Sequence, residues 1–250
     1  MMVPNSADIG DREQGAQSET PISADALATR LGDIARELQH EDDPDSVLAG
    51  IVHAALELVP HAAEASVSLV TGRRTIDSRA ASSDLPRLVD ALQSETGQGP
   101  CLEASYEERV VSVPDLSSDQ RWPEFSRAAY NLGARSMLSF QLFVDGAHLG
   151  ALNLFGKDVG AFDAESERIG ALVAAHAAVA VAGSQQVSQL TQALDTRDLI
   201  GQAKGILMER YKITAQQAFL LLSRASSELN IKLHDVAEQL TVSGEMAKKR

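Results

Sequence analysis

The C-terminal part of the chain carries the residue types that suit contact with a polyanion. Six cations lie between residues 197 and 242: Arg197, Lys204, Arg210, Lys212, Arg224 and Lys232. Residues 195–250 hold nine Lys and Arg against seven Asp and Glu, although the whole chain has a formal net charge of −13. An acidic chain argues against a nucleic-acid partner, but this distribution reverses the argument for one segment. Because the excess of positive over negative residues in this segment is small, phosphate contacts would be few and loop bases would supply much of the specificity.

The chain has one cysteine, Cys101, which ends the run Gly97-Gln98-Gly99-Pro100-Cys101. The glycines and the proline predict a loop. A single cysteine excludes an intramolecular disulfide and a CxxC motif. An exposed loop thiol with a lowered pKa would be a reactive sensor, whereas a buried thiol would be inert. Cys101 is therefore a candidate sensor-pocket residue, and both interpretations stay open from the sequence.

Catalytic and metal-binding patterns are missing from the sequence. There is no G-x-S-x-G motif, no phosphate-binding glycine loop and no Cys/His pair within a motif. The six histidines show no ligand spacing, so we expect no metal site and no cofactor. His176 falls on an apolar helix face and is predicted to belong to the core. The many carboxylates indicate a solvated acidic surface, and we expect the protein not to be an enzyme.

Length and composition favour a soluble protein of one or two domains. The chain has 250 residues, of which 44% are apolar, enough for a sizeable core. No apolar run approaches the roughly 20 residues that span a bilayer, and the N-terminus lacks the apolar region of a signal peptide. We therefore expect a cytoplasmic protein without membrane contact. Residues 1–22 contain few large apolar side chains and are predicted to be disordered.

Hydrophobic periodicity predicts an α+β domain in the first two thirds of the chain. Ser23 precedes a helical stripe of Leu27, Leu31, Ile34 and Leu38, and a second helix is predicted over 45–59. Strands are predicted at 65–70 and 75–80 around Gly72-Arg73, at 110–113, and at 136–144 and 149–155 around Asp145-Gly146. Helices are predicted at 85–94 and from Trp122 and Phe125 to Asn131. This order favours an antiparallel sheet flanked by helices.

One long helix is predicted to join this domain to the basic segment. No proline follows Pro123, and no glycine lies between Gly183 and Gly201. The helix would begin after Asp163, a good N-cap, and continue into residues 197 onward. Three-four spacing gives a heptad seam along it that predicts a parallel coiled-coil homodimer: Val173, His176, Ala180, Gly183, Val187, Leu190 and Leu194. The alternative is a helix that packs only on its own domain.

The spacing of apolar residues predicts three short helices in the basic segment. Ile200, Ala203, Ile206 and Leu207 give the first apolar stripe. Thr214 and Gln217 form a capping-box pattern for the second helix, and Phe219 is predicted to be a core residue. Asn230 breaks the pattern before a third stripe. About 46 residues bury too little apolar surface to be stable alone, so this unit needs a neighbour.

Two family resemblances follow from these residues. The run Gln202-Ala203-Lys204-Gly205-Ile206-Leu207-Met208 and the later Ala218-Phe219, Leu222, Ser226, Asn230, Leu233 and Ala237 resemble an ANTAR domain. Val110-Val111-Ser112-Val113-Pro114-Asp115, Leu149-Gly150-Ala151-Leu152-Asn153-Leu154-Phe155 and Phe162 resemble a GAF domain. The order of the two is similar to that of actinobacterial regulators. The Asn-Lys-Phe-Asp-Glu signature of cyclic-nucleotide-binding GAF domains is absent, so no sensor ligand is named.

The ANTAR resemblance implies an RNA-binding antitermination regulator, in which a dimer grips paired RNA hairpins and prevents terminator formation. The RNA-side residues that match the family or lie in the basic cluster are Gln202, Lys204, Gly205, Arg210, Tyr211, Lys212, Ser226, Asn230 and Lys232. Ser226 and Asn230 would either touch RNA or define the fold. Tyr211 would stack on a splayed base or cap the bundle.

The expected organisation has five segments. They are a tail over 1–22, a GAF-like sensor domain over 23–183, a coiled-coil linker over 184–196, an ANTAR domain over 197–242 and a tail over 243–250. The dimer seam in the linker is formed by Val187, Leu190 and Leu194. A small-molecule effector of the sensor domain would control RNA binding. The alternatives are a protein-interaction module that binds an anti-σ or kinase-type partner, and a thiol redox sensor, neither of which touches RNA.

Overall fold

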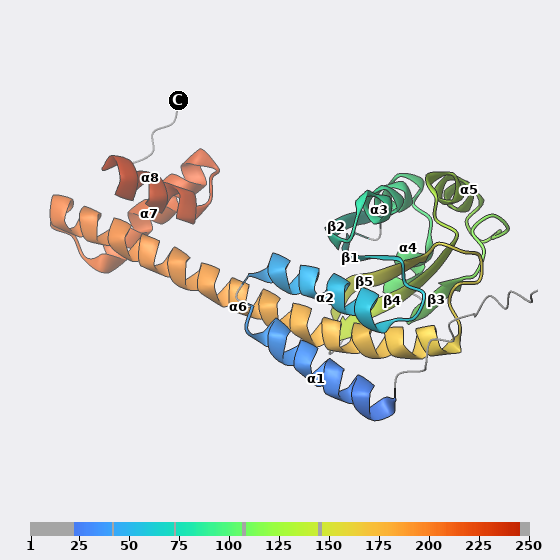
Figure 1. Ribbon diagram of the computed structural model, residues 1–250. Coiled ribbons are helices and arrows are strands. Elements are labelled where there is room, and N and C mark those ends of the chain that lie inside the picture. The colour runs from blue at the N-terminus through green and yellow to red at the C-terminus, as the bar shows by residue number, and fades with distance from the viewer. Residues whose placement is uncertain (1–22, 42, 73, 107–108, 145–146, 246–250) are drawn as a thin grey trace, which may run out of the picture.

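The computed structural model describes residues 23–41, 43–72, 74–106, 109–144 and 147–245. Two bodies are joined by one long helix, as Figure 1 shows. The larger body contains a sheet between two layers of helices, and the smaller body consists of helices only. The predicted tail over 1–22, most of the tail over 243–250 and the turns at Arg73 and Asp145-Gly146 fall wholly or partly outside the described residues.

The sheet is antiparallel throughout and has the order β2-β1-β5-β4-β3. Its strands span Glu64–Thr71 (β1), Thr75–Ala81 (β2), Val110–Val113 (β3), Ser136–Val144 (β4) and Ala147–Gly156 (β5). The predicted α+β class with an antiparallel sheet is confirmed. Both faces of the central strands are buried, so the serines of β1 that alternate with its apolar residues point into a second helix layer and not into solvent. Covered faces on both sides give the body its three-layer order.

One face of the sheet is covered by α1, α2 and α6. These helices span Ala24–Gln39 (α1), Pro44–Leu58 (α2) and Ala164–Tyr211 (α6). Their apolar stripes pack with Val67, Phe140 and Leu152 in one core. Ser23 Oγ accepts a hydrogen bond from Ala26 N, and the Asp43 carboxylate accepts one from Ser46 N, so both helices before the sheet begin at satisfied caps.

The opposite face is covered by three shorter helices. They span Asp84–Thr96 (α3), Pro100–Tyr106 (α4) and Pro123–Leu132 (α5). Phe125, Met137 and Phe155 form a second core there with Trp122. Cys101 lies in α4, so the prediction of a loop at this position is wrong: Pro100 supplies the first residue of a helix, a place that proline tolerates because its missing N–H needs no partner.

Helix α6 runs without interruption from the sheet to the smaller body. The Asp163 carboxylate accepts a hydrogen bond from Ser166 N at 2.8 Å, and the Ser166 hydroxyl completes the capping box. The 48 residues correspond to about 72 Å of helix. The single long helix expected from the spacing of prolines and glycines is therefore present (Figure 1).

The predicted heptad seam is partly contradicted by the structure in its first half. Val173 is 3% exposed and belongs to the core of the larger body. His176, expected in the core, is exposed and its Nδ1 lies 2.8 Å from the Leu172 carbonyl oxygen. Leu172 and Val179 occupy the exposed side instead. An α-helix has 3.6 residues per turn, so a strict seven-residue spacing drifts around it and turns the predicted seam toward the sheet.

The smaller body contains the end of α6, then α7 (Ala215–Leu229) and α8 (Leu233–Ser243). Its core is small and consists of Ala203, Leu207, Ala218, Leu222, Val236, Ala237 and Leu240. The predicted capping box of Thr214 and Gln217 is present at the start of α7. Phe219, predicted to be a core residue, is 42% exposed, because α8 packs against α6 and leaves this side of α7 uncovered.

Substitutions of two glycines, one in α6 and one in α1, test how tightly α6 packs on the sheet. A Cβ atom on Gly170 would lie 2.3 Å from Cζ of the buried Phe140, whereas one on Gly32 of α1 would meet nothing within 4 Å. We expect Gly170→Ala to lower the free energy of unfolding by about 1–3 kcal/mol through overpacking. Gly32→Ala should raise it by about 0.5–1 kcal/mol through helix propensity. Urea denaturation at fixed protein concentration measures both, and equal effects would contradict close α6 packing.

Candidate nucleic-acid interface and sensor pocket

The tip of the smaller body brings Arg210, Tyr211 and Lys212 together. Tyr211 is 54% exposed at the last position of α6. Lys212 ends the helix in the left-handed region with φ 55°, and its ammonium group pairs with Glu209 one turn earlier. An exposed aromatic ring between two exposed cations can stack on a base while the cations contact phosphate.

Ser226 and Asn230 form the turn between α7 and α8. The Ser226 hydroxyl donates to the Ile231 carbonyl oxygen at 2.6 Å, and Ile231 N donates to the Ser226 carbonyl oxygen at 3.2 Å. Asn230 is the C-cap of α7 with φ 53°, a conformation that asparagine tolerates better than most residues. These contacts give both residues a fold-defining role. Lys232 follows as the exposed N-cap of α8.

Lys204 lies on a different side of α6 from Gln202 and Gly205, which are three residues apart and therefore neighbours on one side. Residues two positions apart in a helix point in nearly opposite directions, so exposed Gln202 and half-buried Lys204 do not share a face. A Cβ atom on Gly205 would meet nothing within 4 Å, so no close contact among the described residues requires glycine there.

The nine predicted RNA-side residues therefore do not form one compact site in a single chain. The tip and the α7–α8 turn lie at opposite ends of α7, a helix of 15 residues or about 22 Å. Lys204 lies on α6, seven residues or about 10 Å before Tyr211. A ligand that contacts all of these residues must extend across the body, or two chains must present them together.

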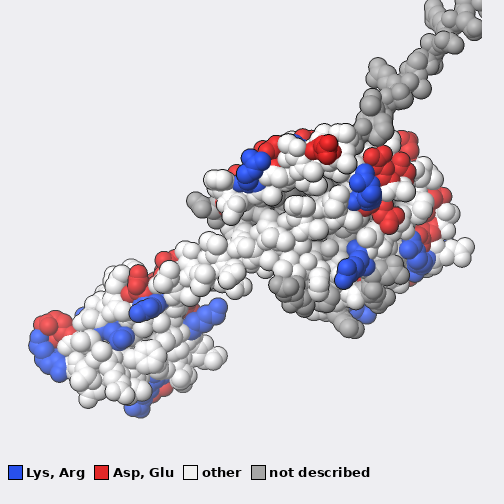
Figure 2. Space-filling model, turned by 90° about the horizontal axis from the view of Figure 1, so that it is seen from below, with Lys and Arg blue, Asp and Glu red and all other residues white. Residues whose placement is uncertain are grey.

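Ion pairs reduce the positive charge that this surface offers. Arg224 Nε lies 2.7 Å from Glu228 Oε1, and this carboxylate raises the pKa of the guanidinium. Within the described ranges, Arg197, Lys204, Arg210 and Lys232 have no ion-pair partner. Figure 2 shows blue patches of Lys and Arg distributed over the smaller body with red between them. The electrostatic field of the smaller body is thus mildly positive and is interrupted by acidic side chains.

Sequence reasoning missed Phe219 as a surface residue. Phe219, Leu220 and Leu221 are 42%, 60% and 40% exposed on consecutive positions of α7. Consecutive residues point to different sides of a helix, so part of each side is apolar and uncovered. The sequence contains a signal for this exposure. Between residues 218 and 222, Ala218 and Leu222 have the four-residue spacing of the side that faces α6. The three large apolar side chains between them cannot all lie on that side, so some of them must be exposed.

The larger body contains a buried polar cluster that the sequence analysis did not anticipate. The Asp90 carboxylate of α3 accepts hydrogen bonds from Ser68 Oγ at 2.6 Å, Ser78 Oγ at 2.9 Å and Asn153 Nδ2 at 3.2 Å. Burial raises the pKa of Asp90, and the serine hydrogen bonds oppose that shift. The donors come from β1, β2 and β5, so this cluster ties α3 to three strands at once.

Cys101 is fully buried beside this cluster. Its side chain packs with Ile76, Leu102 and Ala151 and is 0% exposed. Burial, followed by the nearby Asp90 charge, raises the pKa of the thiol far above its ordinary value. The thiol is therefore protonated and shielded, which is the inert alternative of the two considered from the sequence.

A polar hollow of about 290 Å³ opens next to Cys101 but is not lined by it. Its walls come from the loop before α4, from α4 and from the start of α5: Gly97, Gln98, Gly99, Leu102, Glu103, Tyr106 and Trp122. The Arg121 guanidinium lies 4.4 Å from the centroid of the Trp122 ring at this edge. Among the described residues, no group of three or more His, Cys, Asp and Glu could hold a metal ion.

Comparison with known proteins identifies the families of the two bodies. A family model described as GAF domain matches residues 41–182, and one described as ANTAR domain matches residues 188–240. No curated protein matches the sequence. The chain belongs to the GAF domain family, and it carries an ANTAR domain after the sensor fold. GAF domains are sensors and ANTAR domains are RNA-binding antitermination modules, so both parts are regulatory and not catalytic.

Solved structures share the GAF fold at low sequence identity. The free methionine-R-sulfoxide reductase from Neisseria meningitidis, in complex with its substrate, is 19% identical with a TM-score of 0.50, over 65% of this chain and 92% of that chain. The GAF domain from Acinetobacter phosphoenolpyruvate-protein phosphotransferase is 19% identical with a TM-score of 0.50, over 66% and 97%. That of the Coxiella burnetii enzyme is 17% identical with a TM-score of 0.51, over 65% and 96%. These likenesses show the fold alone.

The accessibility of Cys101 gives a direct test of the thiol-sensor alternative. Because the thiol is buried and its pKa is raised, we expect a thiol reagent at neutral pH to label the native protein at least about 100-fold more slowly than the urea-unfolded protein, since labelling requires local opening. The release of the reagent's chromophore measures both rates. Labelling at the unfolded rate would show that the thiol is accessible and would restore the alternative.

Substitution of Asn230 separates a fold-defining role from RNA contact. We expect Asn230→Ala to destabilise the chain by about 1 kcal/mol, because alanine is strained in the left-handed region. Asn230→Gly should have little effect, because glycine adopts this conformation freely. Urea denaturation followed by circular dichroism measures the stabilities. If the glycine variant also binds RNA like the parent, Asn230 acts through the turn, and a loss of affinity would assign it an RNA contact.

Proposed function

We propose that this protein is a cytoplasmic transcription antitermination regulator that binds RNA hairpin pairs through its ANTAR domain under control of its GAF domain. The observation that carries the proposal is the ANTAR match over residues 188–240. Exposed Tyr211 supports it, as do the cations Arg197, Arg210 and Lys232, which have no ion-pair partner among the residues that the structure describes. Cations position the sugar–phosphate backbone, and an aromatic ring takes an unstacked loop base.

The proposal includes a homodimer, because one small body offers too few contacts. The tip, the α7–α8 turn and Lys204 are separated on one chain, so two copies side by side give an extended surface that suits a pair of hairpins. The exposed side chains of Val187, Leu190 and Leu194, each more than half exposed, support the linker seam. A coiled-coil linker over 184–196 fits the continuous helix α6.

The sensor domain would act through α6. Helix α6 covers the sheet through Ile169, Val173 and Ala177 and ends inside the ANTAR core at Ala203 and Leu207. A small-molecule effector that binds the larger body would change the position of α6 on the sheet and thereby shift the population of RNA-competent dimers. The polar hollow before α4 is our candidate entry site for such an effector.

A protein-interaction module is the second candidate function. The observation that favours it is the exposed apolar surface of Phe219, Leu220 and Leu221, since uncovered apolar patches mark interaction sites. A salt-sensitive complex with a two-hairpin RNA decides for the first function. No RNA binding at physiological salt, in protein shown to be folded, decides for the second.

Replacement of Lys204 tests the RNA site. We expect Lys204→Ala to weaken binding of a two-hairpin RNA and to reduce the slope of log affinity against log salt by about 0.7–0.9, the value for one lost phosphate contact. Titrations at several salt concentrations measure the slope. Lys157→Ala, an exposed lysine of the GAF domain, is the matched control and should leave affinity and slope unchanged. An unchanged slope in the Lys204 variant would remove this residue from the site.

A further inference from the structure

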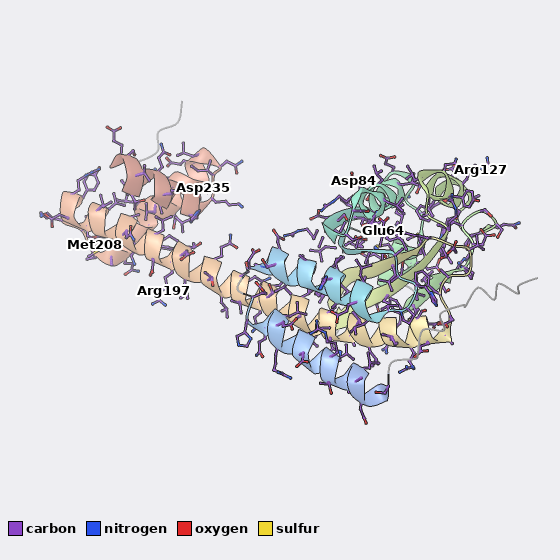
Figure 3. All side chains as sticks on the ribbon, viewed as in Figure 1. Glu64, Asp84, Arg127, Arg197, Met208 and Asp235 are labelled. Carbon is purple, nitrogen blue, oxygen red and sulfur yellow. The ribbon has the colours of Figure 1, made fainter. Side chains whose placement is uncertain are left out.

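The polar hollow beside α4 lies on the side of the sheet that α3, α4 and α5 cover. In Figure 3, Asp84 and Arg127 mark α3 and α5, and α6 lies on the far side of the sheet from both. Small-molecule sites usually enclose about 300–1,000 Å³, so a hollow of about 290 Å³ suits a small ligand only. The chemistry of that ligand can be argued from the few side chains that line the hollow.

These side chains offer hydrogen-bond acceptors. Gln98 Oε1 is buried and has no hydrogen-bond partner among the described residues. A buried acceptor without a partner is destabilising, and a donor brought into the hollow would remove that cost after a small rotation of the amide. The Glu103 carboxylate is a second acceptor, and its two oxygens can serve a ligand as well as a neighbour in the chain. No Lys, Arg or His is among the described residues that line the hollow.

Two aromatic rings complete the lining. Trp122 is 7% exposed and Tyr106 is half-buried. The Arg121 guanidinium lies 4.4 Å from the centroid of the Trp122 ring, and Arg121 Nη2 is paired with Asp119 Oδ2 at 2.6 Å. This contact shows that the ring takes a cation at one face, since aromatic faces attract positive charge. Acceptors and aromatic rings without a lining cation are the surroundings that suit an ammonium or guanidinium group.

We propose that the hollow binds a small organic cation with N–H donors, either a primary ammonium or a guanidinium group on a short apolar chain. The charged group donates to Gln98 Oε1 and to the Glu103 carboxylate. The chain packs against Leu102 and Trp122. The inference rests on the proposed function, in which a small-molecule effector acts through the GAF domain, and it names the chemical class of that effector.

Direct contacts connect the hollow to the sheet. A Cβ atom on Gly99 would overlap the Gln93 side chain, so the backbone of the loop before α4 packs closely on this residue. Gln93 Oε1 accepts a hydrogen bond from Cys101 N at 2.9 Å, and Gln93 Nε2 lies 3.5 Å from Asp90 Oδ1. Asp90 in turn is held by donors from β1, β2 and β5. A ligand that displaces the loop therefore acts on β5, which α6 contacts from the other side.

An anion is the ligand that the opposite charge distribution would take. The exposed Arg74 side chain lies over Gly97, with its Nε 3.6 Å from a Cβ atom placed on that glycine. A carboxylate at this rim would gain one cationic partner, but the acceptors inside the hollow would repel it. Probes that differ only in their charged group separate the two ligand classes.

The emission of Trp122 reports binding, because this residue is the only tryptophan of the chain. The full-length protein is titrated at constant ionic strength with n-butylammonium, n-butanol and butyrate, which all have four carbons. We expect n-butylammonium to change the emission and to bind at least about tenfold more tightly than the other two, because only its charged group gains charge-assisted hydrogen bonds from these acceptors. Calorimetry measures the same affinities. Equal affinities for the three probes, tighter binding of butyrate, or no heat of binding with any probe would overturn the proposal.

Variants of the lining residues locate the binding site. Glu103→Gln and Gln98→Leu should each weaken n-butylammonium binding about tenfold or more, the loss expected for one hydrogen bond to a charged group. Gln98→Leu removes a buried acceptor without a partner, so this variant should be at least as stable as the parent protein. Glu124→Gln, at an exposed position of α5, is the matched control and should leave the affinity unchanged. Parent-like affinity in both lining variants would place the cation elsewhere and contradict the proposal.

The affinity for a two-hairpin RNA is measured separately, with and without n-butylammonium. A protein that binds the cation but no RNA would contradict the proposed function and leave the cation site intact. A protein that binds RNA but no cation would contradict the cation site and leave the RNA function intact.

Discussion

The burial of one side of α6 against the sheet is the contact on which the remaining structure depends. Ile169, Val173 and Ala177 close the core that α1 and α2 also share, and Gly170 lets the helix approach the ring of Phe140. Removal of this helix would expose the part of the sheet face that β4 and β5 form, so α6 cannot detach from the sensor fold at small cost. The same helix supplies Ala203 and Leu207 to the ANTAR core, so the two bodies share a structural element.

The two bodies differ in the polar groups that their interiors contain. The sensor fold buries a carboxyl group and satisfies it with donors from three strands, which ties α3 to the sheet by direction-specific contacts. The ANTAR domain has a small, wholly apolar core and places its hydrogen bonds at helix ends, as in the Thr214–Gln217 box and the Ser226–Ile231 turn. The first arrangement can respond to a bound polar molecule, whereas the second provides a fixed platform.

Periodicity predicted the elements well, because helices and strands impose spacings that are visible along one chain. The strand positions, the cap at Asp163 and the continuity of α6 followed from alternation, capping chemistry and the distribution of proline and glycine. The errors concern which neighbour covers a face. Cys101 lies in a helix because Pro100 begins one, Val173 faces the sheet and Phe219 faces solvent. The burial of Val173 depends on how distant segments pack, which a single sequence does not encode locally. Pro100 at the start of α4 and the excess of large apolar side chains in α7 are local signals that spacing alone does not weigh. The nine RNA-side residues stay predictions, because their roles depend on a ligand and a second chain.

The absence of a break in α6 between Gly183 and Gly201 also determines the mechanics of the chain. A helix with intact hydrogen bonds and no kink behaves as a lever arm whose pivot is the sheet. From Gly183 to Lys204 the arm is about 32 Å long, so a tilt of about 5° at the pivot displaces the far end by about 3 Å. That displacement is comparable to the length of a hydrogen bond. A sub-ångström adjustment in the sensor fold is thus magnified to the scale on which contacts are made or broken.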